Sequence, residues 1–80
     1  MPPNRIAELL AEAGLSKVDL AAACGVGEMT IRRWAHGDTA PSDEQKFRIT
    51  ELLTKSLGRA VSIEYLMGWD RIPATTGEAV

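Results

Sequence analysis

The side chains best suited to chemistry lie together in one short stretch, from Gly27 to His36. Two adjacent arginines, Arg32 and Arg33, carry guanidinium groups that can donate paired hydrogen bonds to guanine edges or to phosphates. Their surroundings are basic, because the segment from Thr30 to His36 holds no acidic residue. The pattern indicates a local nucleic-acid-binding surface, and a solvated basic face is the simpler alternative.

Neighbouring residues are further candidates for base contacts. Glu28 can accept from cytosine N4, or serve as a favourable charge in the first turn of a helix. Met29 suits a thymine methyl group, and a glycine at position 27 lets backbone approach DNA closely. His36 can bind a base or phosphate, or act as a cation at a helix end. The candidate base contacts are Gly27, Glu28, Met29, Arg32, Arg33 and His36.

Four residues are candidates for phosphate contacts. Ser16 and Lys17 lie at an expected helix start, where amide dipoles attract anions. Thr30 offers a hydroxyl group and Lys46 an ammonium group. For Ser16 the alternative is helix capping, and for Lys46 it is an ordinary solvated helix face.

Composition and cysteine content restrict the other possible functions. One histidine and one cysteine, Cys24, allow neither an intrachain disulfide nor a Cys/His metal site. We find no activated nucleophile, carboxylate pair or phosphate-binding loop, so we expect no enzyme, catalytic residue, cofactor, metal or small-molecule substrate. We expect no membrane partner either, since no apolar run approaches about 18 residues. A reducing cytoplasm fits the lone cysteine best.

Eighty residues with 45% hydrophobic and 25% charged side chains are typical of one small globular domain. We expect this domain to span residues 1–72, followed by a flexible tail over residues 73–80 that has few groups to bury. The net charge of -2 disfavours a nonspecific nucleic-acid coat protein. Any DNA-binding face must therefore be local.

Apolar spacing and capping residues predict five helices and no strand, which is an all-α fold. A serine or asparagine is expected to cap most helix starts, and a glycine to supply each left-handed stop. Ser16 with Asp19, and Ser42 with Gln45, are expected to form capping boxes. The expected helices lie between Asn4 and Gly14, Ser16 and Gly25, Gly27 and Gly37, Ser42 and Gly58, and Ser62 and Gly68. In the fourth helix the expected inward stripe is Ile49, Leu52, Leu53 and Leu57.

The second and third expected helices are joined by only Gly25-Val26-Gly27, which predicts a helix-turn-helix. Such a motif needs a small residue where the helices cross, here Ala21, and a turning residue, here Gly25. It also needs apolar side chains between the helices, and these are Leu20, Cys24, Val26, Ile31 and Trp34. Every requirement is met.

The stretch from Lys17 to Gly37, KVDLAAACGVGEMTIRRWAHG, resembles the Cro and repressor family of helix-turn-helix proteins. Pro41 and the segment from Ser62 to Gly68 lie where that family has them, so the resemblance covers about Arg5 to Trp69. It implies a compact five-helix, lambda-repressor-like domain. It also implies a transcriptional regulator, a small Cro-like phage or prophage repressor that binds double-stranded DNA through the major groove. The expected location is the cytoplasm of a bacterial cell or a phage-infected host.

Two positions depart from the family pattern. Many members pair an arginine on the first helix with a glutamate near the end of the recognition helix, and this sequence has Leu10 and Ala35 there. Exchange of a buried ion pair for apolar contact is often neutral or stabilising, so the expected fold stands. A phosphate contact that such an arginine supplies must come from another residue.

A homodimer on a palindromic operator is expected, with Ile63, Tyr65 and Trp69 as the candidate interface. Trp69 has no obvious place in a five-helix core. Alternatively, Ile63 or Tyr65 closes the monomer core and Trp69 packs on the fourth helix. A second functional hypothesis is a protein-interaction module on the same fold, such as an adaptor, inhibitor or antitoxin, with weak DNA affinity.

Overall fold

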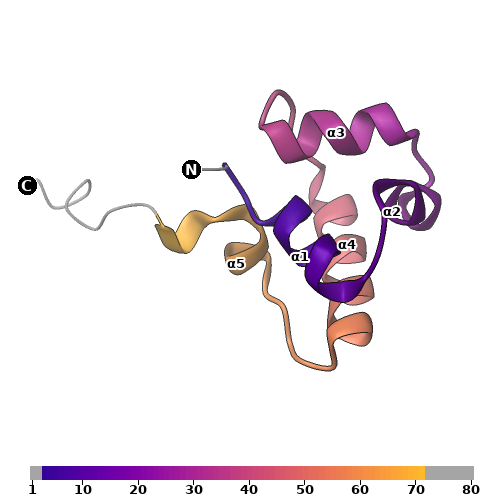
Figure 1. The fold of residues 1–80 in the computed structure, drawn as a ribbon. Helices are drawn as coiled ribbons and strands as arrows, with labels where there is room; N and C mark the ends of the chain where they lie inside the picture. The colour runs from indigo at the N-terminus through magenta and orange to yellow at the C-terminus, as the bar shows by residue number, and fades with distance from the viewer. Residues whose placement is uncertain (1–2, 72–80) are drawn as a thin grey trace, which may run out of the picture.

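The computed structural model describes residues 3–71 and is all-helical over that range (Figure 1). Its elements are α1 (Ile6–Ala13), α2 (Lys17–Cys24), α3 (Glu28–His36), α4 (Asp43–Leu57), α5 (Ile63–Met67) and a short 3-10 helix, η1 (Trp69–Arg71). The predicted five-helix, all-α fold is confirmed. The sequence did not predict η1. The expected tail over residues 73–80 lies outside the described residues, so the division between domain and tail stays a prediction.

Local signals set most helix ends. All five α-helices end at the predicted glycines, each with a positive φ. Ser16 accepts from the Asp19 amide, while the Asp19 carboxylate accepts from the Ser16 amide, which is the predicted capping box. Ser62 caps α5 by accepting from the Tyr65 amide.

The second predicted capping box, at the start of α4, is wrong in one half. Ser42 accepts from the Gln45 amide at 3.2 Å, as a cap should. The Gln45 side chain, however, donates to the Cys24 carbonyl oxygen at 3.2 Å rather than turning back to Ser42. The carbonyls at the end of α2 have no partner within their own helix, so they compete for this donor.

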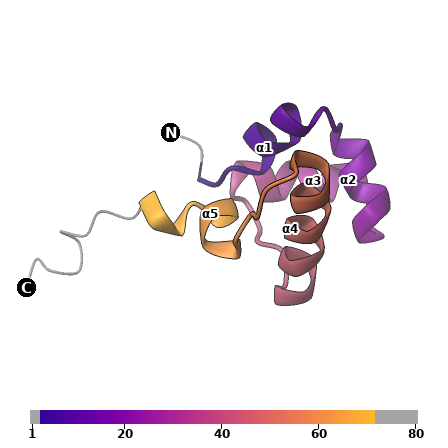
Figure 2. The same ribbon diagram turned by 90° about the horizontal axis from the view of Figure 1, so that it is seen from below.

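The core receives at least one fully buried side chain from every α-helix: Ile6, Leu9, Leu20, Ile31, Ile49, Leu53 and Leu66. Helix α4 packs against α1, α2 and α5, and α3 packs most extensively on α2 (Figure 2). The predicted stripe of α4 faces inward, with Ile49 and Leu53 fully buried and Leu52 and Leu57 partly buried against the core. Thr50 is also buried, which the sequence did not predict.

No helix within residues 3–71 is long and apolar enough to cross a membrane.

Candidate nucleic-acid interface

A tight glycine turn sets the angle between α2 and α3. Gly25 has φ +71°, and the Val26 amide donates to the Ala21 carbonyl oxygen at 3.0 Å to close the turn. A Cβ added at Gly25 would meet nothing within 4 Å. Glycine is therefore required here for its backbone conformation rather than for space.

The space between α2 and α3 is filled as the sequence predicted. Leu20, Ala21, Cys24, Ile31 and Trp34 are buried, and Val26 is partly buried against them. Burial raises the pKa of the Cys24 thiol, which disfavours the reactive thiolate. Cys24 therefore acts as a small core residue between the two packed helices.

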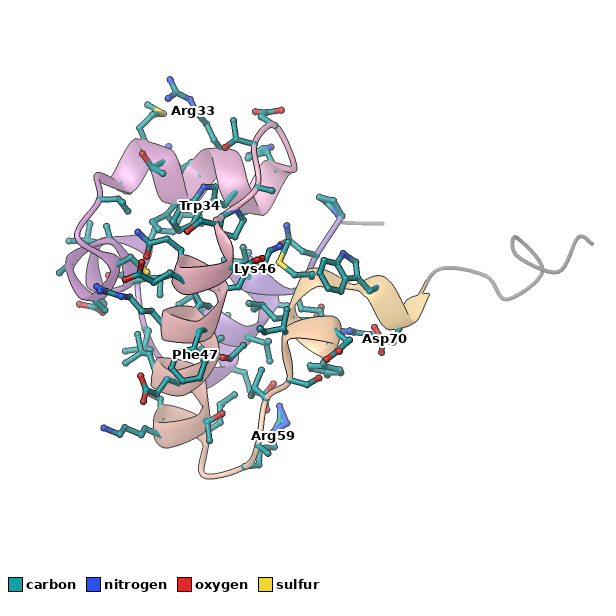
Figure 3. All side chains as sticks on the ribbon, turned by 180° about the vertical axis from the view of Figure 1, so that it is seen from behind. Arg33, Trp34, Lys46, Phe47, Arg59 and Asp70 are labelled. Carbon is teal, nitrogen blue, oxygen red and sulfur yellow. The ribbon has the colours of Figure 1, made fainter. Side chains whose placement is uncertain are left out.

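One side of α3 faces away from the protein. Ile31 and Trp34 define its buried side, and at 3.6 residues per turn the opposite side carries Met29 and His36 at its centre. Arg32 and Arg33 flank this centre, and Glu28 lies beside Arg32; all five residues are exposed. Figure 3 shows Arg33 pointing out from α3. The outward face of α3 therefore brings together five of the six candidate base contacts.

The two arginines on this face have different partners. Arg32 donates to the Glu28 carboxylate at 3.1 Å, in an exposed ion pair one helical turn apart. In the described part of the chain, Arg33 makes no ion pair. Gly27 is exposed and starts the helix in an extended conformation without a side-chain cap. Arg33 is thus the more available guanidinium group, and Glu28 holds that of Arg32.

The start of α2 lies next to this face. Ser16, Lys17, Glu28 and Arg32 line one shallow depression of roughly 330 Å³, whose other side is formed by α1. Hydrogen bonds from Ser16 hold the pKa of the Asp19 carboxylate below its usual range; the bond from the Ser16 backbone amide has the largest effect, and the bond from its hydroxyl adds to it. Ser16 is therefore engaged in capping, and Lys17 supplies the cation of the depression. Thr30 is partly buried at the edge of the inward side of α3.

Lys46, on α4, and Trp69 form a separate cluster. The Lys46 ammonium lies 5.0 Å from the centroid of the Trp69 ring and 3.5 Å from the Asp43 carboxylate, and its side chain is only 13% exposed. This placement holds η1 on α4 and leaves little of Lys46 free for a phosphate. Trp69 thus packs on α4, as the alternative interpretation expected, yet it remains 46% exposed.

The other two candidate interface residues, Ile63 and Tyr65, are partly buried. The Arg5 guanidinium lies 3.9 Å from the centroid of the Tyr65 ring and donates to Asp70 at 2.7 Å, which raises the pKa of Arg5. At the positions of the family's ion pair, Leu10 is buried and Ala35 packs against the core. The exchange for apolar contact is therefore compatible with the fold.

Two links were missed by the sequence analysis. Asn4 was expected to cap the first helix, but the N-cap of α1 is Arg5, and no side chain caps that position. The Asn4 side chain instead accepts from the Ile6 amide at 3.0 Å and donates to the Trp34 carbonyl oxygen at 2.8 Å. Gln45 contacts the end of α2, as described above. Neither link has a local signal, because the partners are 30 and 21 residues apart.

Across residues 3–71, no cluster of His, Cys, Asp or Glu has a metal-binding arrangement.

Comparison with known proteins gives one match. A family model described as helix-turn-helix matches residues 6–59, which run from the start of α1 into the link after α4. No curated protein and no solved structure matches the chain. The matched range contains α2, the turn and α3.

Proposed function

The chain belongs to the Cro/repressor-type helix-turn-helix family, and on that premise we propose that it is a small Cro-like phage or prophage repressor. Membership makes it a DNA-binding helix-turn-helix regulator of transcription. In this proposal a homodimer binds a palindromic operator and represses by occluding it, in the cytoplasm where the DNA lies. The proposal involves no catalytic step, cofactor, metal or small-molecule substrate.

The outward face of α3 is the observation that carries the proposal. The major groove is about 12 Å wide and admits one α-helix. With Ile31 and Trp34 turned inward, α3 would present Met29 and His36 to the groove floor, with an arginine on each flank. Arg33 would donate to a guanine edge or a phosphate, and Arg32 would do so once it leaves Glu28. Gly27 would allow close backbone approach at the helix start.

Phosphate contacts would orient α3 in the groove. Lys17, at the start of α2, is the best-placed cation, because it shares a depression with Arg32. We retain Ser16, Thr30 and Lys46 as weaker candidates, since Ser16 caps α2 and Lys46 lies between Trp69 and Asp43. Such contacts would add affinity without sequence preference.

A dimer follows from the length of α3. Its nine residues extend about 14 Å, which spans only a few base pairs. Two recognition helices on half-sites about 34 Å apart would give the specificity that one lacks. We propose Ile63, Tyr65 and Trp69 as the interface, and the exposed part of the Trp69 ring supports this assignment.

Selection of bound duplexes from a random DNA pool tests the proposal. We expect a palindromic consensus, and binding to it that weakens as salt rises because counterions are released. Arg33→Ala should lose the enriched sequence, whereas Lys55→Ala, the loss of an exposed cation on α4, should keep it. A pool that enriches no sequence would instead favour the protein-interaction module.

A further inference from the structure

Asn4 lies outside the helix-turn-helix but contacts its recognition helix. The residue is 5% exposed, and both ends of its side-chain amide are hydrogen-bonded. Its Nδ2 donates to the Trp34 carbonyl oxygen at 2.8 Å, and its Oδ1 accepts from the Ile6 amide at 3.0 Å. One buried side chain therefore connects the start of α1 to the last turn of α3.

The chain on either side of Asn4 strengthens this connection. The Arg5 amide donates to the Leu66 carbonyl oxygen at 2.8 Å, which anchors the segment to α5. Pro3 packs against Gly37 so closely that a Cβ added there would lie 2.9 Å from the proline Cγ. Residues 3–5 thus clamp the end of α3 against α1 and α5.

The last turn of α3 is held from inside by Trp34, which is buried in the core, and the clamp adds the only side-chain hydrogen bond to its backbone among the described residues. Helix α3 packs mainly on α2, and its contact with α1 is much less extensive. At its end, the Trp34 carbonyl oxygen accepts only from the Gly37 amide and from Asn4, within the described residues. Loss of Asn4 would leave a buried carbonyl without its side-chain donor.

We propose that Asn4 is a positioning residue for DNA recognition. By fixing the last turn of α3 relative to α1, it would set the direction in which Arg33 and His36 project. A small tilt of the helix is amplified at the tips of long side chains, so base selectivity should depend on Asn4 even though it touches no base. This inference rests on the proposed DNA-binding function.

The test uses Asn4→Ser in the full chain. A serine hydroxyl can still accept from the Ile6 amide but is too short to reach the Trp34 carbonyl oxygen. The control is Val61→Ala, which truncates a buried side chain in the link between α4 and α5. This variant should lower the free energy of unfolding without changing any residue of the clamp, residues 3–5. If Asn4→Ser fails to fold, Asn4→Asp, which has the same size and keeps the acceptor, replaces it.

Two measurements are made at a temperature where each variant is fully folded. Amide hydrogen exchange in the last turn of α3 should become about fivefold faster in Asn4→Ser, the change expected for one lost hydrogen bond. The affinity ratio between the selected and a scrambled duplex should fall about fivefold, the lower limit for one base contact. Val61→Ala should leave the affinity ratio between the two duplexes unchanged, and it should not speed hydrogen exchange in the last turn of α3 more than elsewhere.

The possible failures are distinct. If Asn4→Ser matches Val61→Ala in either measurement, Asn4 is a structural residue only and the inference is wrong. If the parent protein itself prefers no duplex, the DNA-binding proposal fails and selectivity cannot depend on Asn4. The exchange experiment would then show separately whether Asn4 holds the last turn.

Discussion

Arg32 and Arg33 are neighbours in the sequence and differ in their surroundings. Arg32 is paired with Glu28 across one helical turn, and Arg33 projects into solvent. Exposed pairs of this spacing contribute only about 0.3–0.5 kcal/mol, so DNA can displace Glu28 at small cost. The Glu28 carboxylate would then be free to accept from a cytosine or to repel a phosphate, so the strength of an Arg32 contact would depend on the group that lies opposite Glu28.

We expect Arg32→Ala and Arg33→Ala each to weaken binding to the selected duplex by roughly 1–3 kcal/mol if the lost contact is to a base. Both side chains are exposed, so the melting temperature should change little. Fluorescence titration against the selected and a scrambled duplex measures the effect, with Lys55→Ala as the charge control. If both arginine variants bind with the affinity of the parent protein, the assignment of α3 to the major groove is wrong.

Asp19 gives α2 a stability that depends on pH. The pKa of Asp19 is lower in the folded protein than in the unfolded chain. The ionised carboxylate therefore stabilises the fold fully above the unfolded pKa of about 4, and this stabilisation is lost as the pH falls through the folded-state pKa. Asp19→Asn should therefore lower the melting temperature at neutral pH, and the difference should vanish in acid. Thermal melts across this range check the effect. A difference in melting temperature between Asp19→Asn and the parent that stays constant as pH falls would contradict the assignment.

The sequence predicted well those residues whose partners are a few positions away. Ser16 and Asp19 are three residues apart, and their reciprocal hydrogen bonds follow from that spacing. Gln45 has the same spacing from Ser42, but a carbonyl 21 residues away accepts its side-chain donor. Nothing near Gln45 in the sequence indicates that competitor. The outward face of α3 is likewise a local pattern, whereas the bond from Asn4 to α3 is not.

At the scale of the elements, the turn between α2 and α3 depends on the backbone of Gly25. Gly25→Val should destabilise the fold, since a β-branched residue is strained at φ +71°. Gly25→Asn should cost much less, because asparagine tolerates this region and a Cβ meets nothing within 4 Å. Melting temperatures of the two variants provide the measurement. Equal melting temperatures would show that the positive φ is not what the turn requires.

The helices were more predictable than their packing. Serine caps and glycine stops act within one turn, so the bounds of α2, α4 and α5 followed from the sequence. How far each side chain of α4 is buried depends on three other helices, so the burial of Thr50 beside the predicted stripe could not be read from the sequence. The short helix η1 depends on Arg5, which donates to Asp70 across 65 residues.

At the scale of the whole molecule, α3 and the proposed dimer surface lie on different parts of the protein. Figure 3 shows Arg33 at one end and Asp70, in η1, well away from it. Lys46 covers part of the Trp69 ring and leaves the rest open. A partner that packs on the open part would leave α3 free for DNA.

Trp69→Ala should abolish the complex of two protomers with one operator while leaving the monomer folded. The expected cause is loss of the exposed ring area, because aromatic side chains dominate small interfaces. Analytical ultracentrifugation with operator DNA counts the protomers, and Lys46→Met separates the dimer contact from the anchoring of η1. If Trp69→Ala still forms the complex of two protomers with one operator, Trp69 is not part of the dimer interface.

The two tryptophans of the chain lie at different depths, Trp34 at 5% and Trp69 at 46% exposure. The molecule therefore carries two intrinsic optical reporters that a collisional quencher such as acrylamide can separate, since it reaches the exposed indole first. In Trp69→Ala all indole emission comes from Trp34, inside α3, when the excitation wavelength lies above the absorption band of Tyr65. The variant made to test assembly thus contains a single tryptophan, and its indole emission reports on α3 alone.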